Sequence, residues 1–241
     1  SLTEGRNAVL EAFRSGKTVD RLFVLDGCQD GPVKTILREA KKQDTMVQYV
    51  KKERLDQLSE TKNHQGVIAY CAACEYAEVS DILENAKKKG EAPFIVLLDG
   101  IEDPHNLGAI IRTANQAGAH GVIIPKRRAV GLTATVARTS AGAVNYTPVA
   151  KVTNLVTVME DLKKEGMWFV CADMDGEEMY SLNLKGPIGL VIGNEGEGVS
   201  RLVKEHCDMV ASIPMKGDID SLNASVAMGV LAYEIVRQRR F

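Results

Sequence analysis

Near the C-terminal end of the chain stands the apolar run Ile188-Gly189-Leu190-Val191-Ile192, which breaks into the glycine-rich stretch Gly193-Asn194-Glu195-Gly196-Glu197-Gly198. A second apolar run, 209–215, breaks into the segment 216–223, and a long helical pattern follows it. Two short strands therefore each open onto a loop of small residues ahead of a helix. In parallel α/β sheets, ligands bind at the carboxyl ends of strands, beside helix N-termini. This part of the chain predicts a ligand site as well as a fold.

The rest of the chain alternates between strand-like and helix-like segments. The run 94–98 is continuously apolar, which is typical of a parallel strand buried on both faces. A helix is expected over 133–143, whereas the polar segment 173–185 is expected to be a loop. The alternation predicts an α/β fold, with a parallel sheet covered on both faces. The domains expected are a small α/β domain over 1–74, a charged, helix-prone linker over 75–92 and a large domain over 93–241.

Composition limits the classes of protein to consider. The 241 residues carry a formal net charge of −2, so any RNA site must be a local basic patch. Five cysteines, few and odd in number, favour reduced thiols in a cytoplasmic protein. The motif Cys71-Ala72-Ala73-Cys74 has no second pair or histidine cluster beside it, so we interpret it as structural and expect no metal. No apolar run approaches roughly 18 residues, so no membrane span is expected.

The glycine-rich stretch 193–198 invites comparison with phosphate-binding loops, but its spacing fits none of them. It lacks the G-x-x-x-x-G-K-[ST] pattern of a P-loop. It also lacks the third glycine or alanine of a dinucleotide fingerprint, and Glu195 and Glu197 would repel a pyrophosphate. The spacing therefore argues against a dinucleotide oxidoreductase. A neutral or cationic ligand with amide-like edges suits this loop better.

Three segments together resemble the motifs of a known enzyme family. The run Asn106-Leu107-Gly108-Ala109-Ile110-Ile111-Arg112 is similar to the N-x-G-x-x-x-R first motif of the SpoU (TrmH-type, SPOUT class) RNA ribose 2′-O-methyltransferases. The stretch 193–198 resembles their second motif, and 213–215 with 221–227 resembles their third. Near the N-terminus, 4–9 and 64–67 resemble the two ends of the family's small, ribosomal-protein-like substrate domain. The resemblance covers nearly the whole chain and is strongest to the branch that methylates a guanosine of bacterial 23S ribosomal RNA.

The resemblance implies a fold and an activity that the pattern of apolar residues does not. It implies a C-terminal trefoil knot, although true knots are essentially absent from proteins in general. It also implies a homodimer that methylates a ribose 2′-hydroxyl of RNA with S-adenosylmethionine as the donor. Two alternatives stay open: a transfer RNA 2′-O-methyltransferase, and a catalytically silent RNA-binding factor in ribosome assembly. The presence of all four motif residues argues against the silent factor; these are Asn106, Arg112, Glu195 and Asn223.

The resemblance also assigns roles to single residues. The catalytic candidates are the motif side chains Asn106, Arg112, Glu195, Ser221 and Asn223. A guanidinium stays protonated in proteins, so we expect Arg112 to fix the target phosphate and stabilise the developing alkoxide rather than act as a base. Glu195 would orient Arg112, accept a proton or hold the ribose. Taken singly, Arg112 is typical of an exposed helix cation, Ser221 of a helix N-cap and Asn106 of a turn residue.

The remaining candidates bind the cofactor or the RNA. Glycines let a backbone approach a ligand closely, so the two loops are expected to hold the adenosine part of the cofactor through Gly193, Ile213 and Leu222, and secondarily through Asn194, Gly196 and Met215. The RNA-binding candidates are basic or polar residues of both domains: Arg6, Asn7 and His64 in the small domain, and the run Lys126, Arg127 and Arg128 with Arg138 in the large one.

Overall fold

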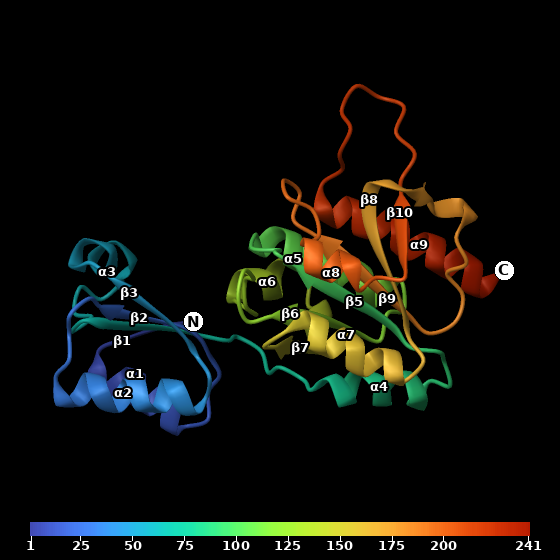
Figure 1. Ribbon diagram of the computed structural model, residues 1–241. Helices are drawn as coiled ribbons and strands as arrows, with labels where there is room; N and C mark the ends of the chain where they lie inside the picture. Colours follow the sequence, from blue (N-terminus) through green and yellow to red (C-terminus); the bar gives the residue numbers. More distant parts are fainter. The chain divides into compact units, whose positions relative to one another are not determined.

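A computed structural model describes residues 1–241, which divide into two compact units (Figure 1). The first comprises Ser1–Glu75 with Gly131–Ala134, and the second comprises Tyr76–Val130 with Thr135–Phe241. Both units mix helices and strands, as the alternating sequence pattern predicts. Every helix is too short or too polar to span a membrane.

The first unit is a four-stranded mixed sheet with helices on its faces. Its elements are β1 (Leu2–Glu4), α1 (Arg6–Arg14), β2 (Val19–Leu25), α2 (Gly31–Lys42), β3 (Met46–Val50), α3 (Lys52–Leu58) and β4 (Val67–Cys71). The strand order is β1-β4-β2-β3, in which only β2 and β3 run parallel. Val9, Phe13 and Ile36 of α1 and α2 pack on one face of the sheet, and Leu55 of α3 packs against Phe23 on the other. The small α/β domain thus has a core of its own.

The second unit is a six-stranded, all-parallel sheet in the order β10-β8-β9-β5-β6-β7. Its strands are β5 (Phe94–Asp99), β6 (Gly121–Pro125), β7 (Val149–Val152), β8 (Trp168–Glu178), β9 (Ile188–Gly193) and β10 (Met209–Ser212). Its α-helices are α4 (Val79–Lys88), α5 (Pro104–Gln116), α6 (Ala134–Thr139), α7 (Leu155–Lys164), α8 (Arg201–Glu205) and α9 (Ala224–Arg240). Two 3-10 turns complete it, at Ala143–Asn145 and Met179–Ser181.

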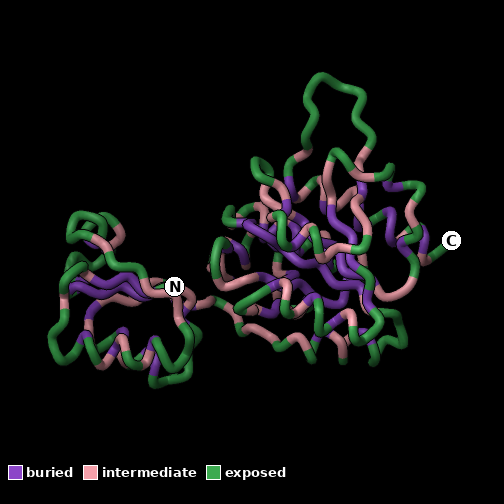
Figure 2. Tube along the Cα trace, viewed as in Figure 1, coloured by how far each residue is buried: buried purple, intermediate pink, exposed green.

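Helices cover both faces of this sheet, which explains why its central strands are apolar throughout. Ile95 and Leu97 of β5 share a core with Ile82 of α4 and Met159 of α7. Alternate strand residues point the opposite way, and on that side α5 and α9 pack together and against β6 and β9. Figure 2 shows the central strands as buried along their length. The predicted parallel sheet with two covered faces is therefore confirmed.

Several segments differ from the prediction, each for a local physical reason. The helix expected over 133–143 ends at Thr139, because Ala141 and Gly142 take left-handed backbone angles, with φ of 53° and 82°. The segment 173–185 is not all loop, since β8 continues to Glu178. Its residues 172–176 bulge out between two stretches that pair with β10. Within the expected linker 75–92, α4 is folded onto the sheet, and its Ile82 and Ala86 are buried.

Candidate active site

The candidate site lies where the direction of strand addition in the sheet reverses. From β5 the chain continues to β6 and β7 on one side, whereas β9 adds to the other side of β5. Asp99, the last residue of β5, pairs in register with Gly193, the last residue of β9. The loops that leave these two strands therefore diverge from a shared edge. Such a switch point is the usual place for a ligand in a parallel α/β sheet.

The loop 193–200 is held in one conformation by tight packing and by two side chains. A Cβ on Gly193 would lie 2.3 Å from backbone atoms of Gly198 and Val199, so only glycine fits there. The amide of Asn194 donates to the Gly100 carbonyl at 3.1 Å and accepts from the Gly196 N–H at 2.8 Å. The buried carboxylate of Asp99 accepts the Ser200 N–H at 2.7 Å. Sequence reasoning missed Asp99, although a carboxylate that ends a buried strand ahead of a glycine is a recognisable signal.

Side chains from all three motifs meet at one carboxylate. Oε1 of Glu195 accepts hydrogen bonds from Asn106 Nδ2 at 3.1 Å, Asn223 Nδ2 at 2.7 Å and the Ala224 N–H at 3.2 Å. Asn223 Nδ2 also donates to Asn106 Oδ1 at 3.2 Å. Oε2 of Glu195 makes no hydrogen bond within the chain, and the residue is exposed. The cluster therefore presents one oriented, free carboxylate oxygen to solvent.

Two helix N-termini position this cluster. Asn106 lies in the first turn of α5, which begins at Pro104 behind the N-cap Asp103. Asn223 is itself the N-cap of α9, and its Oδ1 accepts the Ser225 N–H at 2.9 Å. Ser221 is thus not the N-cap, and its hydroxyl is exposed without a hydrogen bond. A carboxylate is favoured where the N–H groups of α9 begin, so the position of Glu195 agrees with helix electrostatics.

Arg112 does not join the cluster. It lies six residues after Asn106, about 120° away around the helix at 100° per residue. Its side chain is exposed and makes no hydrogen bond or ion pair within the chain. In this structure Glu195 therefore does not orient Arg112, and the guanidinium keeps all its N–H groups available for an outside anion.

The second candidate loop, 213–222, joins β10 to α9 and projects from the unit (Figures 1 and 2). No backbone hydrogen bond forms within it. Ile213 and Leu222 are half-buried, whereas Met215 and Ile219 are 39% and 77% exposed. The loop therefore offers free N–H and carbonyl groups together with apolar side chains. These are the groups that an adenine ring and a ribose need, so the residues fit the expected nucleoside part of the cofactor.

Two family models match the chain. The model of a family described as the SpoU rRNA Methylase family matches residues 93–233. The chain belongs to this SpoU family. A second family model, described as RNA 2′-O ribose methyltransferase substrate binding, matches residues 2–77 of the SpoU chain. The family resemblance inferred from the three motifs is thus confirmed, and with it the enzyme class, an RNA methyltransferase.

Individual relatives cover almost the whole SpoU chain. One relative is YacO from Bacillus subtilis (strain 168), which is named as a TrmH family tRNA/rRNA methyltransferase. The two sequences are 49% identical, and the alignment covers 98% of this chain and 94% of YacO. A similarly named protein of Staphylococcus saprophyticus is 45% identical, over 98% of this chain and 95% of that one. Among solved structures, the SpoU methyltransferase AviRb from Streptomyces viridochromogenes, in complex with the cofactor AdoMet, is 26% identical. It aligns with a TM-score of 0.62 over 98% of this chain and 89% of its own.

The RNA-binding candidates in the larger unit of the SpoU chain differ in their surroundings. Arg127 is exposed and free of partners within the chain, whereas Arg138 donates to Thr135 Oγ1 of its own helix at 3.2 Å. Lys126 is half-buried and directly follows β6. The neighbouring Arg128 forms an ion pair with Glu197 of the second motif, a contact that the spacing of the two residues does not predict.

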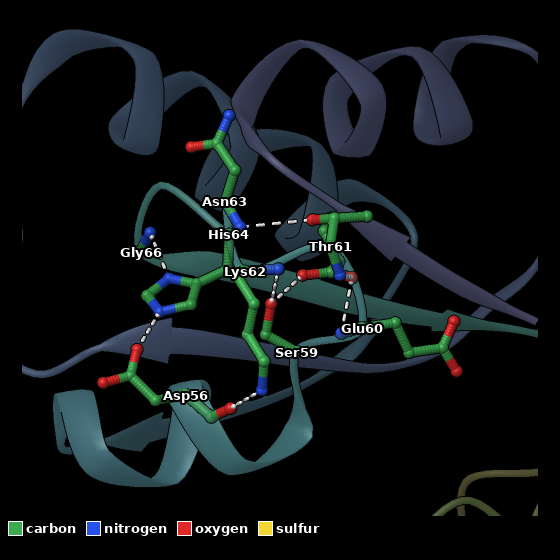
Figure 3. Close-up of polar contacts among 9 residues, drawn as sticks. Asp56, Ser59, Glu60, Thr61, Lys62, Asn63, His64 and Gly66 are labelled. Atoms are coloured by element: carbon green, nitrogen blue, oxygen red, sulfur yellow. Dashed lines mark hydrogen bonds and ion pairs between the residues drawn. The ribbon is translucent and has the colours of Figure 1, made fainter.

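In the smaller unit, the candidate His64 is committed to the fold (Figure 3). Its ring is buried, with Nε2 2.7 Å from Asp56 Oδ1 and Nδ1 accepting the Gly66 N–H at 2.9 Å. Because Nδ1 accepts, the proton sits on Nε2 and is donated to Asp56. That hydrogen bond lowers the pKa of Asp56. His64 thus shapes the loop that ends at Gly66 and has no ring nitrogen left for RNA.

Arg6 and Asn7, the other candidates of this unit, lie next to the same loop. Arg6 is ion-paired with Asp30 at 2.5 Å, and its Nε donates to the Gln65 carbonyl at 3.2 Å. Asn7 is exposed. The two segments that resemble the ends of the substrate domain are therefore neighbours in the structure, although 59 residues separate Arg6 from Gln65.

Proposed function

We propose that this SpoU enzyme methylates the 2′-hydroxyl of a guanosine in 23S ribosomal RNA, with S-adenosylmethionine as the donor. The observation that carries the proposal is the Glu195 carboxylate at the switch point of the sheet. It accepts hydrogen bonds from Asn106, Asn223 and the first backbone N–H of α9. A ribose hydroxyl is a poor nucleophile, so it needs an oriented acceptor for its proton and a fixed position. Glu195 Oε2 is the free acceptor atom in this cluster.

The two loops beside the cluster are where the cofactor would bind. Gly193, Asn194 and Gly196 would present backbone edges from one side, and Ile213, Met215 and Leu222 from the other. When bound, S-adenosylmethionine supplies a methyl group made electrophilic by its sulfonium. The chain need only position the hydroxyl and help remove its proton, because that donor requires no metal activation.

Each polar residue has a role that follows from its surroundings. Asn106 and Asn223 keep the carboxylate of Glu195 oriented through their amide donors. Arg112 is free and forked, so it suits bidentate contact with the phosphate next to the target ribose. Ser221 is exposed on the loop before α9, from which it could donate to the ribose or the cofactor. The side chains of the protein therefore fix the oxygen that accepts the proton. The leaving group of the reaction is part of the methyl donor.

The choice of ribosomal RNA rests on the smaller unit. A substrate-binding unit of about 75 residues precedes the catalytic one. Such an extra unit suits a large folded RNA, because it can bind the RNA at a point distant from the nucleotide that reacts. Transfer RNA is the alternative, because the names of the relatives include both RNAs. We also propose that the enzyme works in the cytoplasm as a homodimer whose C-terminal segment forms the family's trefoil knot.

Transfer of a tritiated methyl group tests the proposal. Purified protein is incubated with labelled S-adenosylmethionine and either deproteinised ribosomal RNA or transfer RNA, and the modified nucleotide is mapped by nuclease digestion. Label on a 2′-O-methylguanosine of 23S RNA is expected. Label in transfer RNA alone would establish the alternative substrate. Cofactor binding without transfer to either RNA would favour a silent assembly factor.

A further inference from the structure

Arg128 occupies an unusual position beside the second-motif loop. Its Nη2 donates to Glu197 Oε2 at 3.2 Å, and both side chains are exposed, by 49% and 78%. An exposed single-contact ion pair adds little to stability. Only one of the five guanidinium N–H groups takes part, which leaves most of the fork open.

The backbone at Arg128 is held in a conformation that costs free energy. Its φ is +55°, a left-handed angle that a non-glycine residue adopts only when the surroundings impose it. The next residue, Ala129, is buried, and the Val130 N–H donates to the Ile101 carbonyl at 3.2 Å. These anchors fix the turn against the chain that leaves β5. The turn therefore holds the backbone of Arg128 in one conformation beside the chain that leaves β5.

The guanidinium lies beside the turn at Gly100, which leads from β5 toward α5. A Cβ on Gly100 would be 3.0 Å from Arg128 Nη2 and 3.5 Å from the Asn194 Cβ, so all three groups are neighbours. Asn194 is also the residue that fixes the second-motif loop through the Gly100 carbonyl. Arg128 thus reaches the edge of the candidate site from the loop after β6, a segment that contributes no motif.

We propose that Arg128 forms a phosphodiester subsite for the RNA strand that enters the site, and that the Glu197 carboxylate occupies this subsite when RNA is absent. A carboxylate and a phosphate present similar oxygen pairs to a guanidinium fork, and phosphate carries the stronger acceptors. RNA binding would exchange the partner of Arg128 and release Glu197. The subsite rests on the proposed function only in that its ligand is RNA.

The proposal predicts effects of opposite sign for the two partners. Binding of deproteinised ribosomal RNA is measured by filter retention at several salt concentrations, and S-adenosylmethionine binding is measured by calorimetry. Arg128→Ala should weaken RNA binding by about tenfold, the size of one charge-assisted contact, and flatten its salt dependence. Glu197→Gln should tighten RNA binding by roughly two- to fivefold, because a competitor for Arg128 is removed. This gain should vanish when Arg128→Ala is also present, and cofactor affinity should stay within about twofold throughout.

The chain offers a matched control pair. Arg201 and Glu205 of α8 form an exposed ion pair at 3.0 Å that no motif includes. Arg201→Ala and Glu205→Gln should leave RNA affinity unchanged. If Arg128→Ala and Glu197→Gln both weaken cofactor binding and leave RNA binding alone, the pair merely fastens the loop and the subsite is wrong. Unchanged RNA affinity in Arg128→Ala has the same meaning.

Failure of the subsite and failure of the proposed function give different results. If the unaltered protein methylates ribosomal RNA while Arg128→Ala binds it normally, the subsite alone is wrong. If the unaltered protein binds RNA through Arg128 yet transfers no methyl group, the proposed function is wrong and the subsite stands. Methyl transfer by Arg128→Ala should show a raised KM for RNA, since the residue binds substrate rather than the reacting atoms.

Discussion

At the scale of single residues, the two oxygens of Glu195 have different tasks. Oε1 is fully used by three N–H donors, so it sets the orientation of the carboxylate. Oε2 is left to face solvent beside the two loops. Hydrogen bonds thus join Asn106, Glu195 and Asn223 in one cluster although they come from three separate segments.

Replacement of Glu195 by Gln tests its role as proton acceptor. The Gln side chain keeps the size and one accepting oxygen, so Asn106 and Asn223 stay engaged and cofactor affinity should remain within about twofold. Loss of the carboxylate should lower kcat by roughly 10²- to 10³-fold, the range of a positioned general base. Single-turnover methyl transfer and calorimetry supply the two measurements. Glu205→Gln, on the nearby α8, is the control, and a kcat for Glu195→Gln within threefold of normal would exclude the role.

Two substitutions distinguish a phosphate-binding role of Arg112 from that of an ordinary surface cation, because only the first role needs the planar shape of the guanidinium. Arg112→Lys keeps the charge but loses the planar fork, so kcat/KM for RNA should fall by about tenfold. In Arg112→Ala, kcat/KM for RNA should fall by at least about 100-fold, because both the charge and the planar fork are lost. A surface cation on α5 would give normal rates in both variants, as judged by steady-state methyl transfer.

At the scale of elements, the first motif combines a packing requirement with a chemical one. A Cβ on Gly108 would lie 1.7 Å from Thr139 Oγ1 and 2.9 Å from the Thr139 backbone, so α5 approaches α6 more closely than any side chain would allow. Thr139 Oγ1 also donates to the Pro104 carbonyl at 3.2 Å. This contact fixes the first turn of α5, and with it Asn106.

Two helical glycines should therefore respond to alanine with opposite signs. Gly108→Ala should destabilise the protein by about 1–3 kcal/mol, since overpacking exceeds the gain in helix propensity. Gly229→Ala in α9 meets only Thr113 Cγ2 at 3.7 Å, an ordinary contact, and should stabilise by up to about 1 kcal/mol. Urea denaturation of both variants measures the difference. A stabilising Gly108→Ala would show that α5 and α6 are further apart.

The elements also show which parts of the fold a sequence can predict. β5 and β9 are buried on both faces, so their continuous apolar runs identify them without any partner. The sequence does not reveal β1 and β7, because three or four residues carry too little pattern, and β1 exists through its pairing with β4. The end of β8 reads as loop, since only β10 makes it a strand. In the site, the motif resemblance brought together Asn106 and Glu195, which are 89 residues apart. The basic run 126–128 marked Arg128 for RNA but not for its contact with Glu197, because that contact depends on how two distant loops fold.

At the scale of the whole molecule, the net charge is small, but folding shifts the pKa of several carboxylates and of one histidine. Partial burial acts to raise the pKa of Glu4, yet hydrogen bonds from Ser59, Thr61 and Glu60 outweigh it and lower that pKa. The backbone N–H of Val33 lowers the pKa of Asp30, and Lys204 lowers that of Asp173. Each group gives stability that is complete above an unfolded pKa of about 4 and is lost as pH falls further.

His120 should make stability depend on pH in a higher range. Its ring is fully buried, and burial lowers its pKa despite the nearby Glu91 carboxylate. Nδ1 of His120 accepts the Phe94 N–H at 2.9 Å. Protonation of Nδ1 would break this hydrogen bond, which joins β5 to the residue before β6. The unfolded chain therefore binds this proton first. Stability should be constant above about pH 6.5 and should decline as pH falls toward 5, before the carboxylates titrate.

Urea midpoints measured from pH 8 to pH 5 test this expectation. The intact chain should lose stability across that range, whereas His120→Asn should give a lower but nearly flat curve, because the amide has no proton to gain. His105→Asn, in which an exposed ring is removed from the first turn of α5, should keep the slope of the intact chain. An equal slope in His120→Asn and the intact chain would mean that the buried ring is not what couples folding to pH. The decline would then have to come from groups on the surface of the two units.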